Sequence, residues 1–210
     1  MFSKLQYISQ GNTIEQQLYN IHQALDNGCD WIQMRFKNSN SHELFTLAEA
    51  VKILCDEYLA TFIINDKVNL AIQINADGVH LGLNDMKISD ARNLLGNHKI
   101  IGGTANTFED ISQLAKEKCD YIGLGPFKFT ATKTNLSPIL GLEKYQDILS
   151  KMQAQNIQIP VYAIGGIETN DIENLLDLGI HGIAVSKLLT NNPLQKELII
   201  QLNEKLYVNF

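Results

Sequence analysis

Cysteine is scarce in this chain, and its placement excludes two roles. The three cysteines, Cys29, Cys55 and Cys119, lie far apart and form no C-x-x-C pair. A disulfide framework needs several paired cysteines in a small secreted chain, and a zinc site needs clustered thiolates or imidazoles. Neither pattern is present, so the sequence predicts three reduced, buried thiols.

A basic surplus and long apolar runs are also missing. The formal net charge is −6, whereas broad nucleic-acid binding needs a concentrated basic face. The N-terminal segment has no apolar run long enough for a signal peptide or a membrane span. We therefore expect a cytoplasmic protein that binds neither nucleic acid nor membrane. Because no linker, low-complexity segment or charge block interrupts the 210 residues, we expect one domain spanning 1–210.

The sequence does contain a regular alternation of short apolar segments with amphipathic segments. The first kind predicts buried strands, and the second kind predicts helices. The predicted strands are 5–8, 31–36, 61–64, 78–81, 99–102, 121–124, 160–166 and 182–186. The predicted helices begin near residues 13, 41, 70, 89, 107, 141, 169 and 193, with Thr13, Ser89 and Thr107 as capping residues.

Eight strand–helix units in succession predict a closed barrel. Strands separated by helices cannot form hairpins, so they must be parallel with right-handed crossovers. Eight such units close into a (β/α)₈ barrel, the α/β fold called a TIM barrel. The alternative is an open doubly wound sheet, but no Gly-rich dinucleotide fingerprint follows the first strand. The segment after the sixth strand is longer than the short loops expected elsewhere in the barrel, and we therefore expect it to have a function.

Residues at the carboxyl ends of barrel strands gather on one face, which holds the active site. The second predicted strand ends in Gln33, Arg35 and Lys37, which share one side because strand side chains alternate. Unpaired charges inside a barrel are costly. These three residues therefore predict a polar site rather than ordinary core.

Two carboxylates follow neighbouring predicted strands, Asp66 after the third and Asp85 after the fourth. A small number of oxygen ligands facing phosphate suits Mg²⁺, which keeps several waters and bridges to the substrate. Each residue has an ordinary alternative, since Asp66 can cap a helix and Asp85 can belong to a turn. Their joint position at adjacent strand ends favours a Mg²⁺ site.

The segment after the sixth predicted strand is rich in hydrogen-bond donors. Thr130, Thr132 and Lys133 lie within four positions, and no acidic residue occurs from Tyr121 to Gly141. Such a set suits a phosphate or pyrophosphate, although a merely solvated loop is the alternative.

A second anion position is predicted after the seventh and eighth strands. Gly165-Gly166 and Val185-Ser186 stand where barrels commonly bind phosphate, and glycines let backbone N–H groups approach it. Tight-turn glycines are the alternative. Two phosphorylated substrates, or one bisphosphate, would fill the two positions.

Taken together, seven motifs at seven strand ends resemble thiamine-phosphate synthase. In chain order they are QMRFK (33–37), IND (64–66), DGVHLGLND (77–85), GGT (102–104), GLGPFKFTATK (123–133), AIGGI (163–167) and VS (185–186). They cover nearly the whole chain, and their order makes the resemblance specific, whereas any one motif alone would be weak.

The resemblance implies a transferase that joins 4-amino-2-methyl-5-(diphosphooxymethyl)pyrimidine to a thiazole phosphate, giving thiamine phosphate and pyrophosphate, with Mg²⁺ on Asp66 and Asp85. It implies that the pyrimidine diphosphate is held by the QMRFK residues Gln33, Met34, Arg35, Phe36 and Lys37 together with Asn65, Thr104 and Lys133. Arg35, Lys37 and Lys133 would stabilise the departing pyrophosphate. The thiazole phosphate would lie on Thr130, Thr132, Gly165, Gly166, Val185 and Ser186.

The chain departs from the family pattern at two positions of interest. Thr104 replaces the usual Ser and keeps its hydroxyl, whereas Asn106 stands where the family often has His. His80 lies in a strand and is expected to pack.

Three rival interpretations remain on the same fold. They are a thiazole tautomerase, a Schiff-base aldolase using Lys133 or Lys37, and a non-catalytic phosphate-ligand-binding barrel. A tautomerase would not need the carboxylates or the diphosphate-binding set, and Lys133 lies in a polar segment rather than a desolvated one.

Overall fold

A closed barrel of eight parallel strands forms the centre of the protein. The computed structural model describes residues 2–37, 39–130 and 137–207. Each strand pairs with its neighbour in the chain, and β8 pairs with β1 to close the barrel, as the alternating pattern predicts. The strands are β1 (Leu5–Ile8), β2 (Trp31–Met34), β3 (Thr61–Asn65), β4 (Gly78–Leu81), β5 (Ile100–Ala105), β6 (Tyr121–Leu124), β7 (Val161–Ile164) and β8 (Gly182–Val185).

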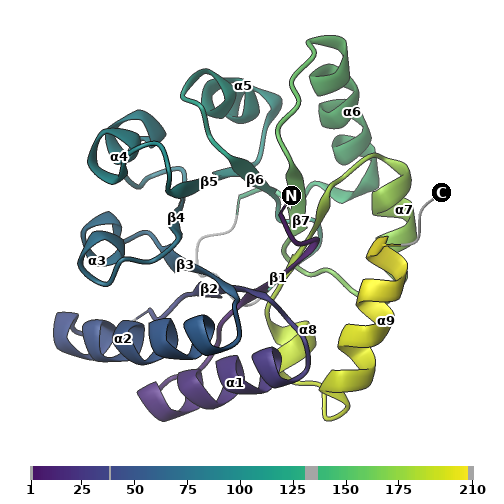
Figure 1. Cartoon of the computed structure of the whole chain (residues 1–210). Helices are drawn as coiled ribbons and strands as arrows, with labels where there is room; N and C mark the ends of the chain where they lie inside the picture. The colour runs from purple at the N-terminus through teal and green to yellow at the C-terminus, as the bar shows by residue number, and fades with distance from the viewer. Residues whose placement is uncertain (1, 38, 131–136, 208–210) are drawn as a thin grey trace.

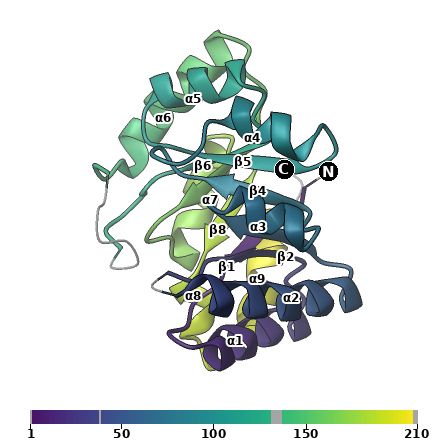
Figure 2. The same cartoon turned by 90° about the vertical axis from the view of Figure 1, so that its left-hand side faces the viewer.

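Helices surround the barrel on all sides (Figure 1). They are α1 (Ile14–Asp26), α2 (Ser41–Glu57), α3 (Val68–Gln73), α4 (Ile88–Leu95), α5 (Phe108–Lys116), α6 (Gly141–Ala154), the 3₁₀ helix η1 (Thr169–Asp171), α7 (Ile172–Asp177), α8 (Lys187–Thr190) and α9 (Gln195–Tyr207). Figure 2 shows α1 and α2 lying side by side along one flank of the barrel. No helix in the described part of the chain is long and apolar enough to cross a membrane.

Two of the three predicted capping residues cap their helices. The side chains of Thr13 and Thr107 accept hydrogen bonds from the backbone N–H groups of the first turns of α1 and α5, as predicted. The prediction that Ser89 caps α4 is wrong. That helix begins one residue earlier, at Ile88, whose buried side chain packs into the core, so Ser89 lies inside the first turn.

Several element boundaries differ from the sequence prediction, most of them by one or two residues. β2 ends at Met34 rather than Phe36, because the Arg35 N–H donates to the Ser9 hydroxyl. β5 extends to Ala105 and pairs with β6 along this added length. The closing helix expected from position 193 is α9, and a short additional helix, α8, precedes it.

Apolar side chains form two layers, one inside the barrel and one between the barrel and its helices. The inner layer includes Trp31, Tyr121 and Tyr162. Their rings meet edge to face, with Trp31 5.1 Å from Tyr121 and 5.2 Å from Tyr162 between centroids, an arrangement that aromatic pairs favour. The three cysteines are free and buried, as predicted, and burial raises the pKa of each thiol to about 12.

We expect Gly102→Ala to destabilise the barrel. A Cβ at this position would lie 2.2 Å from Tyr121 Cζ, and that ring cannot move easily because it is fully buried between Trp31 and Tyr162. Overpacking of this kind typically costs about 1–3 kcal/mol. In urea unfolding, the midpoint concentration should fall while the slope of the unfolding free energy against urea stays the same. An unchanged midpoint would contradict the close packing of Gly102 against Tyr121.

Candidate active site

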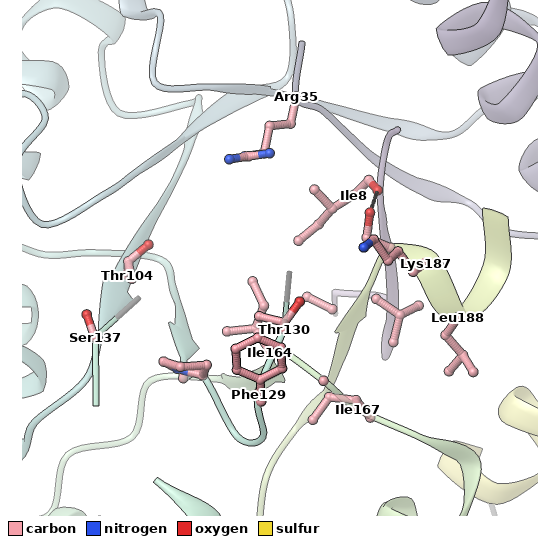
Figure 3. Close-up of a pocket in the computed structure, with 17 residues that line it drawn as sticks. Ile8, Arg35, Thr104, Phe129, Thr130, Ser137, Ile164, Ile167, Lys187 and Leu188 are labelled. Carbon is pink, nitrogen blue, oxygen red and sulfur yellow. Dashed lines mark hydrogen bonds between the residues drawn. The ribbon is translucent and has the colours of Figure 1, made fainter. Parts of the chain in front are cut away.

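A cavity of about 280 Å³ opens at the carboxyl ends of the strands. Its walls come from residues that follow or end β1, β2, β5, β6, β7 and β8. Seven predicted site residues line it, namely Arg35, Thr104, Thr130, Gly165, Gly166, Val185 and Ser186. In Figure 3, Arg35 and Thr104 lie on different walls, and Phe129, Thr130 and Ile164 lie together on a third side. Among the other predicted site residues that the structure describes, Gln33, Lys37, Asn65, Asp66 and Asp85 do not line this cavity.

Arg35 and Lys187 are cations that line the cavity, and buried polar groups hold the backbone of Arg35. Its N–H donates to the Ser9 hydroxyl at 2.9 Å, and its carbonyl accepts from Gln17 Nε2 at 3.2 Å. Ser9 and Gln17 are both buried. Burial lowers the pKa of the Arg35 guanidinium, and the Asp66 carboxylate opposes that shift. The group nevertheless stays charged, because an arginine side chain does not deprotonate in proteins.

Gln33 and Asn65 form a polar pair at the ends of β2 and β3. Gln33 Nε2 donates to Asn65 Oδ1 at 2.9 Å. Gln33 is only 2% exposed, and its Oε1 atom has no hydrogen-bond partner among the described residues. The neighbouring Met34 and Phe36 side chains point the other way and pack in the outer apolar layer, so only their backbone atoms could meet a substrate.

A charged cluster lies where β3 and β4 end. Lys37 donates to the Asp66 carboxylate. Asp66 interacts in turn with Asp85, whose Oδ2 accepts the Gly82 N–H at 2.7 Å. Asp66 has a positive φ of 65°, a conformation that is uncommon outside glycine and often found at functional sites. It does not cap α3, since Lys67 holds that position without a side-chain bond.

The two carboxyl groups differ in acidity. Burial tends to raise the pKa of Asp66, but the hydrogen bonds and charge of Lys37 together with Asp85 outweigh it, so the pKa lies below its ordinary value. Burial, and then the hydrogen bond and charge of Asp66, raise the pKa of Asp85. Two carboxylates this close repel each other unless a proton or a cation lies between them.

This pair fits a magnesium ion. Mg²⁺ is usually bound by one or two carboxylates, with waters and substrate phosphates filling the remaining positions. No third acidic, His or Cys side chain joins Asp66 and Asp85 within the ranges that the structure describes. The donor set is thus too sparse for a fully protein-bound metal and suits one completed by a diphosphate.

Thr104 ends a chain of hydrogen bonds that crosses the barrel interior. Its Oγ1 lies 3.0 Å from His80 Nε2, and His80 Nδ1 lies 3.0 Å from the Tyr121 hydroxyl. That hydroxyl also accepts from Gln6 Nε2 at 3.2 Å. His80 is buried, as predicted, but it also fixes the Thr104 hydroxyl at the cavity wall.

The loops after β7 and β8 form the far wall. Gly165 and Gly166 have φ values of 88° and 72°, and a Cβ on Gly166 would lie 2.8 Å from Lys128 Cβ, so a side chain there would be strained and crowded. The Ser186 hydroxyl donates to the Ile8 carbonyl at 2.6 Å. Thr132 and Lys133 lie outside the described residues.

Sequence analysis alone missed Ser9, Gln17 and the bonded role of His80. All three are buried polar residues: Ser9 follows β1, His80 lies in β4 and Gln17 lies in α1. Buried polar groups are nearly always hydrogen-bonded, so a polar residue in or beside a predicted buried strand was the available signal for Ser9 or His80. Its partner, however, lies on another strand and cannot be identified from local pattern.

The fold and site define a (β/α)₈-barrel enzyme with a cation-lined cavity at the carboxyl ends of its strands. The family model described as thiamine monophosphate synthase (TMP-TENI) matches residues 5–189. The chain belongs to this family and is a transferase of thiamine biosynthesis.

Individual relatives agree along the whole length. The chain is 66% identical over 209 residues to the thiamine-phosphate synthase of Flavobacterium johnsoniae, covering 100% of this chain and 99% of that one. It is 62% identical over 206 residues to the enzyme of the same name from Flavobacterium psychrophilum, covering 98% and 100%. The solved thiamine phosphate pyrophosphorylase of Pyrococcus furiosus matches with a TM-score of 0.80 at 30% identity, covering 97% of this chain and 93% of that one.

Proposed function

We propose that the protein condenses 4-amino-2-methyl-5-(diphosphooxymethyl)pyrimidine with a thiazole phosphate. The bond between the pyrimidine methylene carbon and the diphosphate oxygen breaks, and the thiazole nitrogen bonds to that carbon, giving thiamine phosphate and pyrophosphate. The observation that carries this proposal is the single cavity joining Arg35 and Thr104 to the glycine loop at Gly165 and Gly166. It offers one wall for a diphosphate and another for a phosphate.

The chain's own side chains supply charge and position rather than a nucleophile. Arg35 and Lys37 offset the negative charge that develops on the leaving pyrophosphate. The buried Gln33 Oε1, which lacks a partner among the described residues, can accept from the amino group of the pyrimidine. Asp66 and Asp85 would hold Mg²⁺, which when bound supplies further charge stabilisation of the leaving group. Holding both rings in one cavity favours capture of the methylene carbon by the thiazole nitrogen before water reaches it.

The proposal is tested by mixing the protein with both phosphorylated substrates, with and without Mg²⁺. Formation of thiamine phosphate and pyrophosphate in equal amounts, only when Mg²⁺ is present, is the expected result. Isomerisation of the thiazole phosphate without pyrophosphate release would instead identify a tautomerase. Binding of either substrate without turnover would identify a non-catalytic binding barrel.

Replacing Thr104 tests its hydroxyl directly. Thr104→Val is nearly isosteric but loses the hydroxyl, and a hydrogen bond to a charged group is worth roughly 1.5–3 kcal/mol. We expect kcat/KM for the pyrimidine diphosphate to fall about 10–100-fold. Thr104→Ser should stay near wild type, because the partner of His80 Nε2 is retained.

A matched control separates this effect from simple loss of a hydroxyl. Thr190 Oγ1 lies 2.6 Å from the Tyr7 hydroxyl and does not line the cavity. Thr190→Val should therefore lower stability but leave kcat/KM unchanged. Wild-type kcat/KM in Thr104→Val would show that Thr104 only packs.

A further inference from the structure

Asn106 is a buried amide directly after β5, and it reaches two separate parts of the chain. It is 7% exposed. Its Nδ2 atom donates to the Gly125 carbonyl at 3.0 Å and to the Pro138 carbonyl at 2.9 Å. Gly125 follows β6, and Pro138 precedes α6. One side chain therefore joins the two ends of the long segment between these elements.

Backbone hydrogen bonds close the same place. The Leu140 N–H donates to the Pro126 carbonyl at 3.0 Å, and the Gly141 N–H donates to the Phe127 carbonyl at 3.0 Å. The two bonds lie immediately beside the carbonyls that Asn106 binds. Together with the amide, they fix the start of the segment against its end.

The chemistry of an amide suits this position. Its NH₂ group offers two donors, whereas a neutral imidazole offers one. An asparagine side chain does not titrate, so it cannot act as an acid or a base. Asn106 therefore acts through the two carbonyls that it holds, and not through proton transfer.

The described residues near the two ends of this segment form one wall of the cavity. Gly125, Pro126, Thr130 and Ser137 all line it, opposite Arg35. The Lys128 N–H also donates to the Gly165 carbonyl at 2.9 Å, which ties this wall to the glycine loop after β7. Displacing the ends of the segment would change the shape of the half of the cavity assigned to the thiazole phosphate.

We propose that Asn106 is a positioning residue that holds the wall of the thiazole-phosphate half of the cavity through Gly125 and Pro138. The assignment of that half to the thiazole phosphate rests on the proposed function. The positioning itself rests only on the hydrogen bonds.

The test compares Asn106→Asp with Asn27→Asp by hydrogen–deuterium exchange and by steady-state kinetics. The Asn106 variant keeps the shape of the side chain but loses at least one of its two donors and brings a carboxyl oxygen against the carbonyls. Asn27 is a matched control, since its Nδ2 donates to the Gln23 carbonyl at 2.8 Å and to Gln195 Oε1 at 3.1 Å, away from the cavity lining.

In Asn106→Asp we expect the Leu140 and Gly141 amides to exchange about ten times faster or more, while amides of the barrel strands keep their protection. The KM for the thiazole phosphate should rise about tenfold, and the KM for the pyrimidine diphosphate should change less than threefold. Asn27→Asp should alter none of these values. If Asn106→Asp does not fold, Asn106→His, which supplies one donor, should show the same pattern at smaller size.

Unchanged exchange at Leu140 and Gly141, or equal acceleration throughout the barrel, would overturn the positioning role. So would a KM increase shared equally by both substrates. Failure of the wild-type protein to form thiamine phosphate would refute the proposed function instead, and the exchange measurement would still decide the role of Asn106.

Discussion

Asp66→Asn should lower kcat by about 10³-fold, equal to about 4 kcal/mol of transition-state stabilisation. Asparagine, like aspartate, tolerates the left-handed backbone conformation, and the φ of 65° at this position makes it a cleaner replacement than alanine. The change removes one of the two carboxylates that would hold Mg²⁺. Turnover should also require more Mg²⁺ to reach its maximum, and excess chelator should abolish the activity of the wild type.

An independent measurement concerns Asp85. Burial and, after it, the neighbouring Asp66 carboxylate raise the pKa of Asp85, so removing the Asp66 charge should lower that pKa. Titration followed by NMR would detect the shift. Asp56→Asn is the control, because Asp56 also pairs with a lysine, Lys52, but on the exposed side of α2. The metal assignment fails if wild-type turnover persists in excess chelator, or if Asp66→Asn keeps the wild-type response to Mg²⁺.

The barrel could be predicted from the sequence because the necessary signal is local. Apolar segments such as Tyr121 to Leu124 are too short for helices and end at a glycine and a proline, so the order of strands and helices follows from composition alone. The cavity face follows from the fold, because the carboxyl ends of all the strands meet there. Arg35 and Thr104 both line the cavity at this face.

The remaining details depend on pairings that local sequence does not encode. Alternation along β2 predicts that the Met34 side chain faces away from the barrel interior. The motif that contains Met34 nevertheless predicts a substrate contact, and only the Met34 backbone could make that contact. The line from Gln6 through Tyr121 and His80 to Thr104 joins four different strands. Its existence depends on the stagger of the strands around the barrel, which no short segment specifies.

Arg35→Gln should reduce kcat by about 10²–10³-fold, the usual cost of losing one preorganised group that stabilises developing charge. Arg35 is half-buried on the cavity wall, where low polarity strengthens its interaction with a leaving pyrophosphate. Its backbone is held by Ser9 and Gln17, so the replacement should leave the local chain in place. Single-turnover rates with both substrates would isolate the chemical step from product release.

The stability of the same variant distinguishes a catalytic role from a structural one. No carboxylate forms an ion pair with Arg35 in the described part of the chain, and burying such a charge costs free energy. Arg35→Gln should therefore unfold at the same urea concentration as the wild type or a higher one, while losing activity. Arg35→Lys, which keeps the charge but not the planar fork, should be intermediate in rate. Lys151→Gln removes a positive charge from an exposed pair with Asp147 and should change neither property. A loss of stability that matches the loss of rate in Arg35→Gln would mean that Arg35 supports the fold rather than the reaction.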